Sequence, residues 1–190
     1  MTLWAFLAGG AAAIVLLMVL SRLRGFAAQR PANYSAQVPA LDIRRQLNGS
    51  YLCEGVIFGP LGRVSSRFTA RMQAEWQDNS CTLREDFLFD DGSRQARAWQ
   101  LHLRDDGQIR AEAADVIGSG RGQQSGPTVQ LLYRLQLPAK SGGHVMSVTD
   151  WLYLTPGGTL VNRSQFRKYG VKLAELVATI RPLSPEEAAR

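Results

Sequence analysis

The segment VSSRFTARMQAEW, Val64–Trp76, decides the fold of this 190-residue chain. Small or apolar side chains occupy its even positions, among them Phe68 and Met72, and polar side chains occupy every odd position. Successive side chains of a strand point to opposite faces, so this alternation predicts a strand with one buried and one solvated face. The period of two recurs along most of the chain that follows, which predicts a single antiparallel β-domain.

Turn signals such as Gly-Pro, Asp-Asn and Asp-Asp-Gly separate the alternating segments. The predicted strands, besides Val64–Trp76, are Tyr51–Phe58, Ser80–Phe89, Gln95–Arg104, Gln108–Val116, Thr128–Leu137, His144–Leu154, Thr159–Tyr169 and Val171–Ile180. The glycine-rich segment Gly118–Gly126 is consistent with a short bulged strand where backbones approach closely. Eight to ten short strands joined in series predict an all-β, up-and-down barrel, with a β-sandwich as the alternative.

The chain begins with an apolar segment, Leu3–Leu20, which contains no charged residue. As a helix it would be about 27 Å long, close to the thickness of a bilayer core. It lacks the basic leader and the small-residue cleavage site of a signal peptide. We therefore expect a transmembrane anchor over residues 1–20, a flexible juxtamembrane linker over 21–40, the barrel over 41–181 and a polar tail over 182–190.

Arg22 and Arg24 follow the apolar segment, and no basic side chain precedes it. The positive-inside tendency predicts a single-pass protein of the bacterial inner membrane with a cytoplasmic domain; a periplasmic domain is the alternative. Cys53 and Cys81 fall on the first and third predicted strands, about 9–10 Å apart and too far for a disulfide. Two free thiols suit a reducing compartment.

The formal charge of +6 gives little support to nucleic-acid binding. After Arg30 the chain has 19 basic and 16 acidic residues, and most of the basic ones are arginines on the polar faces of strands, as on a solvated surface. His102 and His144 are the chain's two histidines, too few for a histidine-rich metal site. No nucleophile motif is present. We therefore expect no nucleic acid, metal or cofactor and assign no catalytic residue.

The informative residues are polar ones on otherwise apolar strand faces: Glu85, Arg97, Asp115, Asp150, Asn162 and Glu175. If these faces point inward, four carboxylates and one guanidinium enter the barrel, where each must be paired, hydrogen-bonded or neutralised. They could lie at barrel rims and pair with one another. They could instead form the polar part of an otherwise apolar small-molecule pocket. Acid–base chemistry by two of the carboxylates is a third interpretation.

Several segments together resemble an uncharacterised bacterial family, domain of unknown function 3833. They are Arg67–Thr69, Glu75-Trp76, Leu83–Phe87, Asp90–Gly92, Arg97–Trp99, Ala114–Gly118, Asp150-Trp151, Asn162-Arg163, Lys168–Gly170 and Leu173–Glu175. The resemblance covers roughly Leu41–Arg181 and implies a barrel without an established activity. Many members look like envelope lipoproteins, whereas this chain has no cysteine before Cys53. A more distant likeness is to lipocalins, through Gly49-x-Tyr51, Thr149–Trp151 and Arg181.

These observations together predict a membrane-anchored, lipocalin-like protein that binds a hydrophobic or amphipathic, lipid-like small molecule. The six polar residues named above are the predicted ligand-binding residues. A non-catalytic interaction or scaffold protein with a filled barrel is the alternative. A carboxylate-based hydrolase or isomerase is a second alternative. The expected partners are the membrane, through Leu3–Leu20, and the small molecule; the sequence identifies no protein partner.

Overall fold

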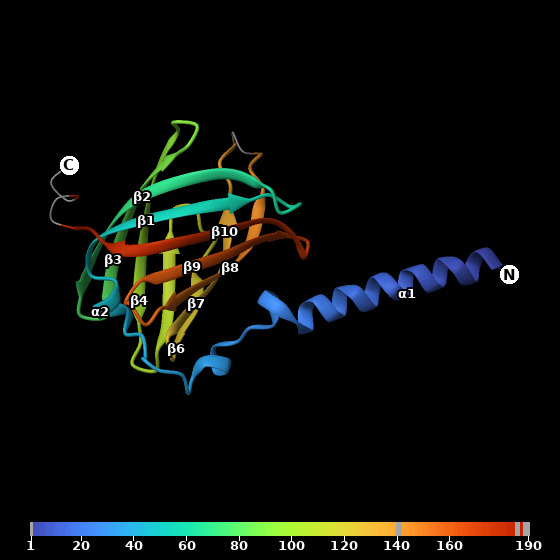
Figure 1. Ribbon diagram of the computed structural model, residues 1–190, viewed down its shortest axis with the longest axis horizontal. Helices are drawn as coiled ribbons and strands as arrows, with labels where there is room; N and C mark the ends of the chain where they lie inside the picture. The colour runs from blue at the N-terminus through green and yellow to red at the C-terminus, as the bar shows by residue number, and fades with distance from the viewer. Residues whose placement is uncertain (1, 140–141, 185–186, 188–190) are drawn as a thin grey trace.

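The computed structural model describes residues 2–139, 142–184 and 187. Within these residues, ten antiparallel strands form a closed barrel in which each strand pairs with its neighbours in the chain and β1 pairs with β10 (Figure 1). The predicted up-and-down barrel is thus confirmed over the sandwich. Its strands are β1 (Gly49–Phe58), β2 (Val64–Gln77), β3 (Ser80–Phe89), β4 (Arg94–Leu103), β5 (Gln108–Ala113), β6 (Gly120–Ser125), β7 (Thr128–Gln136), β8 (Val145–Leu154), β9 (Leu160–Lys168) and β10 (Val171–Pro182).

Strand β2 has the two faces that its alternation predicts. Phe68, Ala70, Met72 and Ala74 are buried in the barrel interior, while the odd-numbered neighbours are exposed or half-buried. Most other strands contribute alternate residues to the same core. Burial of these apolar side chains is the main favourable contribution to folding, at about 25 cal/mol per Å² removed from water.

The glycine-rich segment forms β6, which lies between β5 and β7. A Cβ atom on Gly122 would lie 2.5 Å from the carbonyl oxygen of Gln130, a distance that real Cβ atoms do not adopt. Only glycine fits here without displacing the β7 backbone. The predicted close approach of two backbones at this segment is therefore confirmed.

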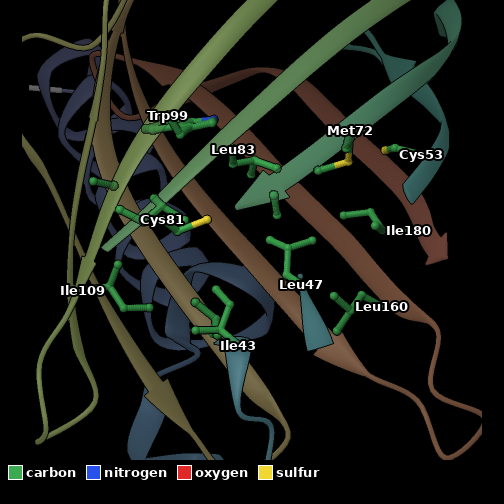
Figure 2. Close-up of a cluster of buried hydrophobic side chains, with 14 of the residues drawn as sticks. Ile43, Leu47, Cys53, Met72, Cys81, Leu83, Trp99, Ile109, Leu160 and Ile180 are labelled. Carbon is green, nitrogen blue, oxygen red and sulfur yellow. The ribbon is translucent and has the colours of Figure 1, made fainter. Parts of the chain in front are cut away.

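The segment before β1 closes one end of the barrel. Leu41, Ile43 and Leu47 are each 2% exposed, and α2 (Ile43–Gln46) lies between the first and last of them. Figure 2 shows Ile43 and Leu47 surrounded by interior side chains of several strands, including Cys81, Met72 and Leu160.

Three hydrogen bonds join this segment to the strands. Leu41 N donates to Gly126 O (2.8 Å), Ile43 N donates to the side-chain oxygen of Gln124 (2.9 Å), and the Trp76 indole donates to Leu47 O (2.7 Å). We call this closed end the floor and define it as Leu41–Leu47.

The segment between the N-terminal helix and the floor is attached to the outside of the barrel, which differs from the expected flexible linker over 21–40. It forms two short 3-10 helices, η1 (Gly25–Ala28) and η2 (Pro31–Tyr34). Tyr34 packs edge-on against the outward-facing Trp151 of β8, with ring centroids 5.4 Å apart. Both Tyr34 and Tyr153 donate a hydrogen bond to Gln29 Oε1. These contacts leave Trp151 with no exposed surface although it points away from the barrel interior.

The N-terminal segment is helical, as predicted, and forms α1 (Thr2–Leu23), which extends away from the barrel (Figure 1). Across the described residues, no helix combines the length and the apolar character that crossing a membrane requires. The transmembrane anchor predicted for Leu3–Leu20 therefore finds no support in the structure.

The barrel wall is incompletely paired beside β4. Strand β5 pairs with β4 only from Trp99 to Leu103, because β5 ends at Ala113. The chain then crosses to β7, where Ile117 N donates to Arg134 O and Gln136 N donates to Asp115 O. In the described structure, Arg94–Ala98 consequently has a strand neighbour on the β3 side only. A cleft of about 340 Å³ lies between this half of β4 and residues 114–115, and we call it the wall cleft.

Candidate functional site

The barrel encloses a cavity of about 120 Å³ above the floor, which we call the inner cavity. Its lining is mostly apolar and aromatic, with the polar side chains Glu85, Arg97, Tyr133, Asp150, Asn162 and Ser164. An engineered apolar cavity of about 150 Å³ binds benzene, so a cavity of this size can hold one small ring. The barrel is therefore not completely filled by its aromatic residues.

A second space of about 240 Å³, the vestibule, adjoins the inner cavity on the side away from the floor. The two spaces share Phe68, Phe87, Arg97, Phe166 and Leu176 as lining residues. The vestibule also reaches the ends of β3 and β7 and the start of β4, where the strand-connecting turns lie opposite the floor. The interior is thus closed at the floor and widens toward the other end.

Arg97 lines the inner cavity, the vestibule and the wall cleft. Its Nε donates to Asp115 Oδ1 at 3.1 Å, and the two side chains are 15% and 27% exposed. The guanidinium carbon lies 4.0 Å from the centre of the Trp99 ring, a cation–π arrangement. Within the described residues, its buried Nη2 has no hydrogen-bond partner. Burial opposes the charge, but Tyr133, Glu85 and Asp115 together raise the pKa of Arg97.

Glu85 lies directly opposite Arg97 in the β3–β4 register and lines the inner cavity. The Glu85 side chain is half-buried and forms part of the cavity lining. Burial raises the pKa of Glu85 to about 7, and the carboxylates of Asp150 and Asp115 act in the same direction, while Arg97 and Trp99 oppose the shift. Glu85 therefore changes charge near neutral pH.

Asp150 enters the inner cavity from β8. Its Oδ1 accepts a hydrogen bond from Asn162 Nδ2 at 2.5 Å and another from Ser164 Oγ at 2.7 Å, both on β9. Burial raises the pKa of Asp150, although these two donors and Arg97 favour the ionised form. Asn162 thus reaches the cavity as a residue that orients Asp150.

The prediction that Glu175 points into the barrel is wrong. On β10 it is Leu176 and Ile180 that line the inner cavity, and Glu175 lies on the outer face. There it accepts hydrogen bonds from Arg163 Nε (2.6 Å) and Lys172 Nζ (2.7 Å). Although its burial acts in the opposite direction, these partners lower the pKa of Glu175.

The cause of this error is a break in the β9–β10 register between Lys172 and Ala174. Leu173 and Leu176 both pack against the core, three positions apart, because the irregularity inserts one residue into the alternation. Counting by twos from Leu173 therefore places Glu175 on the wrong face.

The sequence did not single out Ser164 and Tyr133 as site residues. Ser164 shares an inward face with Asn162, two positions earlier, and this spacing is the signal that identifies it. Tyr133 packs edge-on against Trp99, with ring centroids 5.1 Å apart, and burial raises its pKa, so its hydroxyl stays protonated. Its aromatic ring fits the apolar face of β7, so the alternation does not mark it as a polar residue of the site.

The cysteines are unsuited to nucleophilic chemistry. Cys53 and Cys81 are both free, as predicted, and both are buried. Burial raises the pKa of the Cys53 thiol to about 12 and that of the Cys81 thiol to about 11, so both stay protonated. In the part of the chain that the structure describes, no three His, Cys, Asp or Glu side chains are grouped to hold a metal.

The barrel is similar to several solved structures. Rv2717c from M. tuberculosis shares 15% identity at a TM-score of 0.55, over 78% of this chain and 99% of that one. The S-type phycobiliprotein lyase CPES from Guillardia theta shares 6% identity at a TM-score of 0.51, over 74% and 90% of the two chains. A redesigned β barrel, mFAP1, bound to DFHBI, shares 9% identity at a TM-score of 0.39, over 72% and 95%. At these identities the first two support the barrel fold alone.

No protein with a curated description matches this sequence. The family described as protein of unknown function (DUF3833) matches residues 20–182, and the chain belongs to this family.

Proposed function

We propose that this member of the family binds an amphipathic small molecule inside its barrel. The observation that carries the proposal is the inner cavity: an apolar space closed by the floor, with Glu85, Arg97 and Asp150 on its wall. A concave, mostly apolar lining with a few convergent polar groups is the usual arrangement of a small-molecule site. Structural likeness to a lyase of phycobiliproteins is consistent with this proposal but supports only the fold.

The division of the interior into two spaces suggests how such a ligand would lie. Its apolar part would occupy the inner cavity against Phe68, Phe87 and Trp99, which lie on β2, β3 and β4. Any longer part would extend through the vestibule toward the open end. Removal of this apolar surface from water would supply most of the affinity, at about 25 cal/mol per Å².

The test uses a neutral aromatic probe and two variants, one on the inner face of β7 and one on its outer face. Toluene is titrated into the full chain by isothermal calorimetry, because its ring matches the inner cavity. Leu131 lines that cavity, whereas the next residue, Leu132, lies on the outer face of the same strand. We expect Leu131→Trp to abolish toluene binding and Leu132→Trp to leave it unchanged. No binding to the unmodified chain, or equal loss in both variants, would overturn the proposal.

Native mass spectrometry of the full chain purified from cells identifies the natural ligand class. We expect an additional mass that is released on denaturation and is reduced in Leu131→Trp. An equal additional mass in both variants would place the bound molecule outside the inner cavity.

A further inference from the structure

Acidic groups outnumber basic groups around the barrel interior. Glu85 and Asp150 line the inner cavity, and Asp115 lines the vestibule. Arg97 is the one basic side chain among the described residues that line either space. Uncompensated charge of one sign in a low-dielectric space attracts the opposite charge strongly.

The guanidinium of Arg97 already interacts with groups of the protein itself. Its Nε is bonded to Asp115, and its guanidinium stacks on Trp99. The ion pair balances one carboxylate with one guanidinium and leaves Glu85 and Asp150 as the excess. Burial raises the pKa of both Glu85 and Asp150, and the carboxylate of Asp150 raises that of Glu85 further.

Both excess carboxylates have oxygen atoms free to accept hydrogen bonds. Glu85 lines the cavity and has no ion pair in the described structure; the Trp99 indole is the one side-chain donor beside it. The two side-chain donors to Asp150, from Asn162 and Ser164, both bind Oδ1, so Oδ2 has no side-chain donor among the described residues; the backbone of Trp151 also favours the ionised form. A carboxylate oxygen that borders the cavity and lacks a strong donor of its own is open to a donating ligand.

Aromatic rings complete a surface suited to a cation. Phe68 and Phe87 lie on the lining with ring centroids 5.4 Å apart, and Trp99 and Tyr133 meet edge to face on the same lining. The faces of aromatic rings attract ammonium groups as well as apolar groups. Carboxylates beside aromatic rings form a site that favours a cationic head on an apolar body.

We propose that the ligand of the inner cavity is an organic amine whose ammonium group is recognised by Glu85 and Asp150. This inference rests on the proposed function, since it names the class of molecule that the cavity binds. Its rival is an anionic ligand, which would bind the unpaired Nη2 of Arg97. An anion would add a further negative charge beside the carboxylates of Glu85 and Asp150, so the charges on the lining favour the amine.

The test compares three probes of similar shape and different charge: 2-phenylethylamine, 2-phenylethanol and phenylacetate. Each is titrated into the full chain by calorimetry at pH 7.5. A charge-assisted hydrogen bond contributes about 1.5–3 kcal/mol, so we expect the amine to bind about tenfold or more tightly than the alcohol. We expect phenylacetate to bind more weakly than the alcohol.

Two isosteric variants assign the preference to the cavity. Glu85→Gln removes the negative charge inside the barrel, while Asp86→Asn removes one from the adjacent exposed position on β3. The two variants have the same net charge. We expect Glu85→Gln to reduce the amine-to-alcohol affinity ratio about tenfold and Asp86→Asn to leave the ratio unchanged.

The outcomes separate this inference from the proposed function. If the alcohol binds and the amine binds no better, the amine inference fails and small-molecule binding stands. A preference for phenylacetate would overturn the inference in favour of recognition by Arg97. An equal change of the amine-to-alcohol affinity ratio in Glu85→Gln and Asp86→Asn would show that the preference arises from the overall charge of the protein and would overturn the inference. If toluene and all three probes fail to bind, both proposals are overturned.

Discussion

Two ion pairs of the barrel wall have similar separations between their charged atoms and opposite surroundings. Arg84 and Glu75 lie on the outer face of the β2–β3 wall, 3.2 Å apart and 54% and 57% exposed. Arg97 and Asp115 lie 3.1 Å apart at the edge of the interior, 15% and 27% exposed. Water screens the outer pair, whereas the inner pair lies beside the Trp99 ring and the half-buried carboxylate of Glu85. The distance between two charges therefore says little about their contribution until their surroundings are known.

The largest expected effect comes from the ring on which the inner guanidinium stacks. Trp99→Ala removes a side chain that is 5% exposed, and we expect the free energy of unfolding to fall by about 3–5 kcal/mol. The matched control is the outward-facing Gln100→Ala, for which we expect a change within about 0.5 kcal/mol. Urea denaturation of both variants measures the difference. Similar losses of unfolding free energy in both variants would show that the inner and outer faces of β4 contribute equally to stability.

The next effect is the dependence of stability on pH through Glu85. Its pKa is about 7 in the folded chain and 4.5 as its ordinary value, so the folded state holds the proton more tightly. This contribution to stability is fully present below pH 4.5 and is lost as the pH rises to 7, by about 3 kcal/mol in total. Burial is the main cause of this raised pKa; Asp150 and Asp115 raise it further, while Arg97 and the Trp99 indole lower it.

Glu85→Gln isolates that contribution. We expect this variant to be more stable than the unmodified chain at pH 8, by up to about 3 kcal/mol, and equally stable at pH 4.5. Denaturation curves at both pH values measure the difference, with Asp86→Asn as the surface control. A difference that does not change with pH would show that Glu85 titrates normally in the folded chain.

A smaller effect is expected from the inner ion pair itself. Arg97→Gln leaves Asp115 without its partner in a partly desolvated position, and we expect a loss of about 2 kcal/mol, less than for a fully buried pair. A double-mutant cycle with Asp115→Asn separates the coupling energy from the loss of the stacking on Trp99. A coupling energy near zero would make the inner pair equivalent to the outer one.

The smallest effect is expected on the outer face. Arg84→Gln breaks a pair in which both side chains are more than half exposed, and we expect a change below about 0.5 kcal/mol. The change should decrease further in high salt, because screening acts on exposed charges first. Denaturation at low and high ionic strength checks both statements.

The sequence predicted those features that repeat every two residues. The order of the strands, the barrel and the convergence of Glu85, Arg97 and Asp150 follow from alternation, because a strand in a closed barrel has only an inner and an outer face. The prediction of a strand over Gln108–Val116 was wrong at its end, because β5 stops at Ala113 and the chain crosses to β7. Glu175 was misplaced because a register irregularity before it shifts the alternation by one residue without changing the composition. Residue period alone does not reveal such an insertion.

Features that depend on contacts between distant segments were beyond sequence reasoning. The attachment of residues 25–34 to the outer wall depends on Tyr34 and Gln29 meeting β8, more than a hundred positions away. The segment has no periodicity of its own, so nothing local distinguished it from a linker. Likewise, half of β4 is unpaired because β5 ends at Ala113 and the next residues pair with β7 instead. That change of partner depends on the arrangement of the whole sheet.

That unpaired half of β4 has a mechanical consequence. A barrel whose strands are all hydrogen-bonded to both neighbours can widen only by breaking backbone hydrogen bonds between two strands, because the spacing of the strands fixes its circumference. At the vestibule end Arg94–Ala98 has no strand partner on the β5 side, and the Arg97–Asp115 ion pair spans this gap in the sheet. At the floor end, by contrast, each strand boundary is held by a ladder or by the floor itself. Widening at the vestibule end therefore requires the Arg97–Asp115 contact to break but no ladder of backbone hydrogen bonds beside Arg94–Ala98, so the volume of the interior in this structure is not an upper bound on the size of molecule that fits.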